Sequence, residues 1–206
     1  MIRLATLAPK DLNLNGDQGN LIALRNYLQA AGFEVQVLEA AAGASLPEAD
    51  FYLVGHGSIA AMSHLEPWLK EVLPEAFSSS VPVLAVGSGA LRMGANLGKH
   101  PRSDLERVSE FQVTPWRDYE VLGYRNTDTD APNLETEGSA TLTMLHGPVL
   151  AKNPRLLAEI ATAVVSSSGE SWTAAEPHAL THFKRELLRI CGQIWLLEAE
   201  KEVPGF

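Results

Sequence analysis

The chain has little cysteine and few basic residues, and both shortages limit what it can be. Cys191 is the only cysteine among 206 residues, which excludes an intramolecular disulfide and a cysteine-rich zinc site. The 16 lysines and arginines are outnumbered by 25 aspartates and glutamates, so the formal net charge is −9. Nucleic acids and anionic membranes attract clustered positive charge, and this balance argues against either as a partner.

Long apolar runs are also lacking. No apolar stretch approaches the ~18 residues needed to span a bilayer. The opening residues MIRLATLAPKDLN reach Pro9 and polar side chains too early for a signal peptide, so we expect a cytoplasmic protein. With 46% hydrophobic and 20% charged residues, the chain has the composition of one globular domain over residues 1–206.

Short apolar runs alternate with segments of helical periodicity in the first half of the chain. The expected strands are 2–7, 33–38, 50–54 and 81–86, and the expected helices are 21–31 and 62–76. This alternation with short loops predicts an α/β fold of three layers, with a mostly parallel central sheet and helices on both faces. The continuously apolar runs FYLV and VPVLAV suit strands that are buried on both sides.

The second half of the chain is less regular. Polar, turn-like segments fill much of 99–138, around possible strands at 111–114 and 119–124, and we expect DTDAPNLETE to be a solvated acidic loop. A strand at 141–145 ends at His146, and a helix over 153–165 begins with Asn153 as N-cap. The segment SSSGES is expected to be a linker. A long amphipathic helix is expected over about 176–202, with one apolar side formed by Leu180, Phe183, Leu187, Ile190, Ile194 and Leu197.

Three unusual turns follow expected strands: NLNGDQGN (13–20), GHGS (55–58) and GSGA (87–90). Ligands bind at the carboxyl ends of strands in such sheets, so the three turns predict one cleft. The third turn lies in VPVLAVGSGALRMG (81–94), which reads as a strand, a sharp turn and a helix. Many hydrolases present a nucleophile on that geometry, but here the apex position holds Gly87.

Three blocks together resemble a known family. NLNGDQGN (13–20), VPVLAVGSGALRMG (81–94) and MLHGPVLAKNPRLL (144–157) are similar, in order and spacing, to the cobyric-acid-synthase type (CobB/CobQ) of class I glutamine amidotransferase. The likeness is greatest to the glutaminase subunit GatD of lipid II isoglutaminyl synthase. That subunit acts with a Mur-ligase-like partner to amidate the peptidoglycan stem glutamate. The resemblance implies a class I glutamine amidotransferase-like, flavodoxin-like fold.

The resemblance also implies which residues form the site. Members of the family hydrolyse glutamine with a cysteine on the elbow, backbone N–H groups that stabilise the oxyanion, and a histidine that transfers the proton. The histidine falls on His146 and the cysteine falls on Gly87. The glycine turn Gly55, His56, Gly57 and the elbow residues Ser88 and Gly89 fall on the substrate-binding positions. His56 replaces a glycine of the family, and Asn15 stands where the family usually has tyrosine.

Because glycine cannot form a thioester, the resemblance implies a glutamine amidotransferase-like protein whose glutaminase activity is lost. Docking on a Mur-ligase-like or other amidoligase partner would remain, or binding of glutamine or a small amide in the cleft. No cofactor and no metal are expected. The residues around Gly87 also differ from the family, which favours natural divergence over a single substitution in an active glutaminase.

Other interpretations stay open at this point. Gly87 can be a turn glycine with positive φ. A shifted register would make Ser88 with His146 a serine-hydrolase dyad acting on an amide or ester, although the bulky Val86 disfavours it. His56 either donates into the cleft or bonds backbone within its turn. His178 and His182 lack a third ligand and are expected to be a surface pair, and Cys191 is expected to pack in the core.

Overall fold

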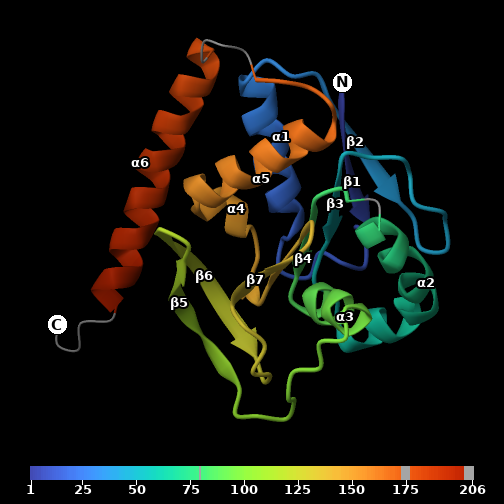
Figure 1. Ribbon diagram of the computed structural model, residues 1–206. Helices are drawn as coiled ribbons and strands as arrows, with labels where there is room; N and C mark the ends of the chain where they lie inside the picture. The colour runs from blue at the N-terminus through green and yellow to red at the C-terminus, as the bar shows by residue number, and fades with distance from the viewer. Residues whose placement is uncertain (79, 173–176, 202–206) are drawn as a thin grey trace.

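A six-stranded sheet forms the centre of the fold and confirms the predicted α/β class (Figure 1). The computed structural model describes residues 1–78, 80–172 and 177–201, with the side chains of 196–201 left out of the description. The strands run in the order β2-β1-β3-β4-β8-β7, and all neighbours are parallel except β7 and β8. Their bounds are β1 Ile2–Leu7, β2 Val35–Ala40, β3 Phe51–Val54, β4 Val83–Val86, β7 Leu134–Glu137 and β8 Ala140–Thr143.

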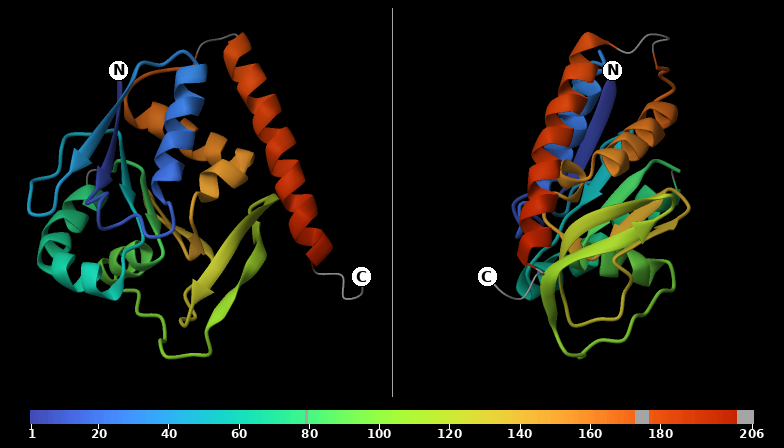
Figure 2. Two further views of the ribbon diagram at one scale, coloured as in Figure 1. Left: turned by 180° about the vertical axis from the view of Figure 1, so that it is seen from behind. Right: turned by 90° about the vertical axis from the view of Figure 1, so that its left-hand side faces the viewer.

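Helices cover both faces of this sheet. One face carries α1 (Gln18–Ala30), α4 (Val149–Lys152) and α5 (Pro154–Ser167), with α6 (His178–Lys201) lying against these three, and the other face carries α2 (Ile59–Ser78) and α3 (Ser88–Asn96) (Figures 1 and 2). Side chains alternate along the strands, so Phe51 and Leu53 pack toward α1 while Tyr52 and Val54 pack toward α2. Every residue of β3 and β4 is buried, as the continuously apolar runs predicted.

The middle of the chain forms a second, antiparallel sheet of β5 (Val108–Trp116), β6 (Tyr119–Thr127) and β9 (Leu145–His146). The first two strands are longer than the expected 111–114 and 119–124. The expected strand 141–145 is divided, because the chain leaves the main sheet after Thr143. It then pairs Leu145 with Arg125 and His146 with Tyr124 of the hairpin. His146 is thereby placed where the two sheets meet.

Several sequence expectations are corrected. The acidic segment DTDAPNLETE is not wholly a loop, because its part Leu134–Glu137 is the strand β7 at the edge of the main sheet. Polar side chains suit an edge strand, which hides it from a search for apolar runs. Helix α2 begins and ends outside the expected 62–76 and contains Pro67 and Pro74, and α5 extends into the expected linker.

The last helix packs through a narrower strip than its sequence suggests. Leu180 is buried, and Phe183 and Leu187 pack against the core, but Ile190 is 45% exposed and is not part of the buried side. Cys191 is buried as expected, and its Sγ donates a hydrogen bond of 3.2 Å to the carbonyl of Ala151. The side chain of Leu197 and the expected helix ends at 176 and 202 lie outside the described residues. No described helix has the length and apolarity that crossing a bilayer would require.

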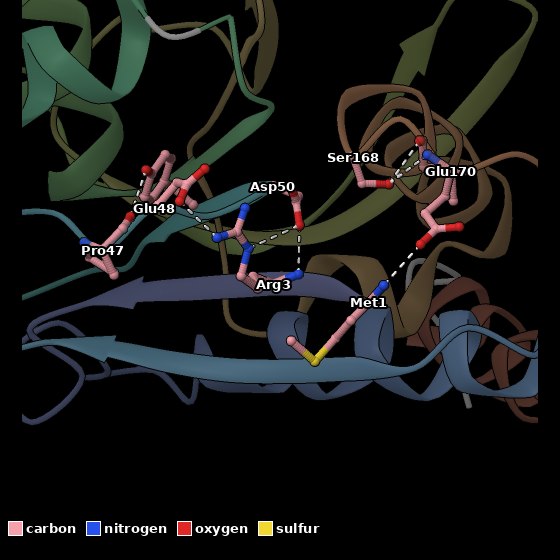
Figure 3. Close-up of polar contacts among 9 residues, drawn as sticks. Met1, Arg3, Pro47, Glu48, Asp50, Ser168 and Glu170 are labelled. Carbon is pink, nitrogen blue, oxygen red and sulfur yellow. Dashed lines mark hydrogen bonds and ion pairs between the residues drawn. The ribbon is translucent and has the colours of Figure 1, made fainter.

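Polar contacts fasten the first strand to its surroundings (Figure 3). The Arg3 guanidinium forms an ion pair of 3.0 Å with Glu48, and its backbone N–H donates to the Asp50 carboxylate at 2.7 Å. The Met1 ammonium contacts Glu170 at 2.9 Å, beyond the end of α5. These contacts join β1 to the segment before β3 and to the connection between α5 and α6. The ion-pair partners Glu48 and Glu170 are exposed, so the two ion pairs add little to the free energy of folding, whereas the buried Asp50 carboxylate would be costly to leave unpaired.

Asn153 precedes α5 at the predicted position but does not cap it with its side chain. Its carboxamide is 3% exposed and joins the hairpin to α4. The oxygen accepts a hydrogen bond from the Leu122 N–H, and the nitrogen donates to the carbonyls of Leu122 and Val149, each at 2.8 Å. Asn153 therefore holds the second sheet against the domain from inside the protein.

We expect Asn153→Ala to lower the free energy of unfolding by about 2–4 kcal/mol, since it leaves the buried N–H and C=O of Leu122 unpaired. Urea denaturation followed by circular dichroism measures the change. Asn26→Ala is the matched control, because the Asn26 oxygen accepts from the neighbouring Arg25 and joins no two elements. Equal losses in the two variants would contradict the role assigned to Asn153.

Candidate functional site

The three glycine-containing turns lie at the carboxyl ends of β1, β3 and β4, which are neighbours in the sheet. The sequence prediction of one shared region is therefore correct. The turns approach so closely that side chains would not fit: a Cβ on Gly89 would lie 2.5 Å from the carbonyl oxygen of Gly55, and one on Gly55 would overlap the carbonyl of Leu12. Gly55 and Gly89 thus serve backbone packing, and neither lines the neighbouring cavity.

The turn between β4 and α3 has the geometry of a nucleophile elbow. Gly87 has φ 55° and ψ −119°, a conformation that residues with a Cβ adopt only under strain. Its N–H donates to the carbonyl of Thr143 at 2.8 Å, and its carbonyl accepts from the N–H of Leu91 at 2.9 Å, which starts the helix. The apex is residue 87, and Ser88 begins α3. Ala85 and Gly89, two residues to either side, are small as an elbow requires.

Two histidines close over this apex. The rings of His56 and His146 meet edge to face, with centroids 4.6 Å apart and planes at 88°. A Cβ added to Gly87 would lie 2.5 Å from His56 Nδ1 and 2.7 Å from His146 Cε1. Gly87, His56 and His146, which the sequence singled out separately, are therefore brought together in one place.

His146 is held as a neutral imidazole. It is 4% exposed, and its Nδ1 lies 2.8 Å from the Asn15 side-chain nitrogen, which can only donate. Nδ1 is therefore the acceptor, and the ring proton resides on Nε2. Burial, assisted by the neighbouring His56, lowers the pKa of His146 to about 4. At neutral pH the ring is uncharged and weakly basic.

His56 is fixed by its backbone and by its ring. The Asp17 carboxylate accepts a hydrogen bond from the His56 backbone N–H at 3.0 Å, and His56 Nδ1 accepts from the Ser88 backbone N–H at 3.0 Å. Burial lowers the pKa of this histidine. The His56 ring therefore forms a hydrogen bond with the backbone through Nδ1, as one of the two sequence interpretations held. The ring proton of the neutral imidazole then resides on Nε2.

Asp17 is a residue that sequence reasoning missed. Its side chain is fully buried, and burial raises its pKa, while the backbone N–H groups of His56, Gly147 and Asn15 act in the opposite direction. It joins the first glycine turn to the second. Its place inside NLNGDQGN was a signal, since a carboxylate in a turn at a strand end meets backbone donors of neighbouring turns.

The Ser88 hydroxyl is engaged away from His146. Its oxygen accepts a hydrogen bond from the Gly57 N–H at 2.9 Å and donates to the Gly57 carbonyl at 3.1 Å. In a serine hydrolase, the nucleophilic hydroxyl forms its hydrogen bond with the general base instead. The geometry does not bring Ser88 and His146 together as a dyad.

A cavity of about 850 Å³ opens beside the two histidines. Charged side chains from three elements line it: Glu66 of α2, Arg92 of α3, and Arg107 and Asp128 at the base of the hairpin. Arg92 pairs with Glu66 at 2.9 Å, and Arg107 pairs with Asp128 at 3.2 Å. No local pattern in the sequence pointed to these four residues, because they come from segments that are distant in the chain.

Within the described residues, no group of three or more His, Cys, Asp or Glu side chains is placed to hold a metal ion. His178 and His182 are both exposed on α6, as expected of a surface pair.

Comparison with known proteins identifies the fold. No family model matches the chain, and no curated protein matches it. A glutamine amidotransferase from Thermotoga maritima superposes with a TM-score of 0.52 at 15% sequence identity, covering 98% of this chain and 99% of that chain. PurLQS from Thermotoga maritima gives 0.47 at 14% identity over 81% and 97%, and a glutamine amidotransferase from Methylobacillus flagellatus gives 0.40 at 13% over 93% and 92%. The chain thus has a class I glutamine amidotransferase-like, flavodoxin-like fold.

We expect His146 to stay uncharged well below the usual histidine range, with a ring titration near pH 4 in a two-dimensional NMR experiment. Unfolding frees the ring to bind a proton below its ordinary pKa of 6.5. The stability that neutral His146 contributes is therefore complete above pH 6.5 and is lost as the pH falls toward about 4.

His146→Asn supplies the comparison, because its carboxamide oxygen can accept from Asn15 without titrating. Wild type should lose more stability than this variant across the same pH interval. Asp17 is present in both proteins, so its own titration cancels. A ring that titrates near 6.5, or parallel stability profiles, would refute the assignment.

Proposed function

We propose that this protein is a glutamine amidotransferase-like protein related to the glutaminase subunit of lipid II isoglutaminyl synthase, and that it has lost glutaminase activity. The observation that carries the proposal is the turn at Gly87, which has the backbone conformation of a nucleophile elbow but no side chain at its apex. Glutaminase chemistry of this family requires a thiolate that attacks the amide carbon and forms a thioester. Hydrogen at the apex forms no such bond.

The surroundings of Gly87 support loss of activity in the natural protein. The space that a nucleophilic side chain would need is filled by His56 and His146. A single substitution introduced into a working glutaminase would leave that space open. Ser88 offers no replacement, since its hydroxyl is bonded to Gly57 on both sides.

The cavity supports binding as the retained function. It presents charge of both signs, with the carboxylates of Glu66 and Asp128 beside the guanidinium groups of Arg92 and Arg107. An α-amino acid carries one ammonium and one carboxylate, so a cavity of this composition suits glutamine or a related small amide. Binding would require the ligand to exchange its charges with these ion pairs.

Apolar side chains at the rim of the cavity support docking of a partner protein. Leu14 is 61% exposed and Ile59 is 89% exposed, and both line the cavity. An exposed apolar patch beside a site favours association with another surface, and we infer that Leu14 and Ile59 contribute to one here. The family resemblance makes a Mur-ligase-like amidoligase the partner that we propose.

The purified protein should release no ammonia from glutamine above the buffer blank, because the thioester intermediate cannot form without a nucleophile. A glutamate dehydrogenase-coupled assay measures this, with an active class I glutaminase as positive control. Turnover at rates typical of the family would overturn the proposal. Turnover that disappears in Ser88→Ala would establish the serine alternative.

Ile59→Asp should weaken association with the Mur-ligase-like protein of the same organism, while leaving the melting temperature almost unchanged because residue 59 is 89% exposed. Size-exclusion chromatography with light scattering, on mixtures of the purified proteins, measures the complex. Leu188→Asp is the matched control, since Leu188 is 60% exposed on α6 and does not line this cavity. The proposed partnership fails if wild type forms no complex, and the proposed surface fails if both variants bind alike.

A further inference from the structure

The imidazole of His56 stands where the nucleophile of an elbow would stand. A Cβ on Gly87 would be 2.5 Å from His56 Nδ1 and 3.0 Å from His56 Cγ, and real Cβ atoms essentially never come closer than 3.0 Å to a neighbour. His146 Cε1 would be 2.7 Å away on the other side. Any side chain at residue 87 therefore displaces one of the two rings.

The same imidazole also occupies the hydrogen-bond donor that acyl transfer uses. In an elbow, the backbone N–H of the residue after the nucleophile helps to hold the oxyanion. That N–H belongs here to Ser88, and it already donates to His56 Nδ1 at 3.0 Å. A substrate oxygen could reach this donor only after the ring had left.

Several contacts hold His56 in this position. Its backbone N–H is bonded to the buried Asp17 carboxylate, and its ring packs edge to face on His146. The following residue, Gly57, is tied through both its N–H and its carbonyl to the Ser88 hydroxyl. The turn carrying His56 is thus fastened to the elbow itself.

We propose that His56 is a second block on acyl transfer, in addition to the missing sulfur. The proposal rests on the proposed function, because it assumes that the elbow descends from one that carried a nucleophile. It predicts that a thiol added at residue 87 does not by itself allow acyl transfer. The His56 ring must be removed as well.

The test compares wild type, Gly87→Cys, His56→Ala and the double variant Gly87→Cys/His56→Ala. Gly87→Cys alone should lower Tm by about 5 °C, the scale of one overpacked core position in a chain of this size. The Tm changes of Gly87→Cys and His56→Ala should not add in the double variant. Much of the Tm loss caused by Gly87→Cys should be recovered there. The introduced thiol reacts with iodoacetamide when its thiolate displaces iodide. This alkylation should be faster in the double variant than in Gly87→Cys. Peptide mass spectrometry separates that thiol from Cys191.

Glutamine hydrolysis gives a second readout of the same variants. If the double variant turns over glutamine, we expect a rate at least about a hundredfold above Gly87→Cys, the effect typical of one oxyanion donor. If neither variant turns over glutamine, non-additive Tm values with faster alkylation in the double variant still support the block. Additive Tm values with equal alkylation rates would overturn it.

One control variant and one substitute variant complete the comparison. Gly87→Cys/His64→Ala removes an exposed histidine of α2 that does not touch the elbow, and it should behave as Gly87→Cys does. His56→Gly replaces His56→Ala if the latter fails to fold. Turnover by Gly87→Cys as fast as by the double variant would overturn this inference and leave the proposed function standing. Glutamine turnover by wild type would instead overturn the proposed function. The Tm and alkylation comparisons would still test whether the His56 ring blocks the elbow.

Discussion

The small volume above the apex of the β4–α3 turn is the constraint on which the site depends. The backbone at Gly87 has positive φ, and the rings of His56 and His146 approach it closely enough to exclude a Cβ. Gly89 and Gly55 approach each other through their backbones, and the hydrogen bonds of Ser88 to His56 and Gly57 hold the two turns together. An interior packed to this density accepts a new side chain only by displacing another. The glycine at residue 87 and the His56 ring that packs over it are therefore one structural feature.

Buried polar groups supply the connections that hold this arrangement. The buried Asp17 ties the turn after β1 to the turn after β3, and the buried His146 bonds to the exposed Asn15 of the same loop. Asn20 extends the pattern, since its carboxamide bonds to the backbone of Gly147 and Leu150 just beyond His146. Buried polar groups are costly unless they are paired, so each of these contacts restricts the loops to one arrangement. Hydrogen bonds hold the two histidines, and the site opens toward the charged cavity.

The fold class was predictable because its signals are local. Continuously apolar runs such as FYLV and VPVLAV can be read without knowing their neighbours, and glycine-rich turns after them mark strand ends. β7 was missed because an edge strand needs no apolar pattern, and its residues LETE resemble a loop. Asn153 was placed correctly before α5, but its side chain bonds to β6, a partner that no local pattern reveals. For the site, the sequence selected Gly87, His56 and His146, whereas Asp17 and the charged residues of the cavity were found only in the structure.

By itself, the sequence determined that glycine occupies position 87 of the expected turn, that a histidine follows the expected strand at 141–145, and that the sheet is mostly parallel with helices on both faces. These properties reside in residue identity and in short-range periodicity, which exist before the chain folds. Only the tertiary structure decided that the His56 ring lies where a Cβ at residue 87 would be and that the Ser88 hydroxyl bonds to Gly57. Those outcomes depend on contacts between segments 31 or more positions apart, whose distances are fixed when the turns after β1, β3 and β4 pack at one edge of the sheet.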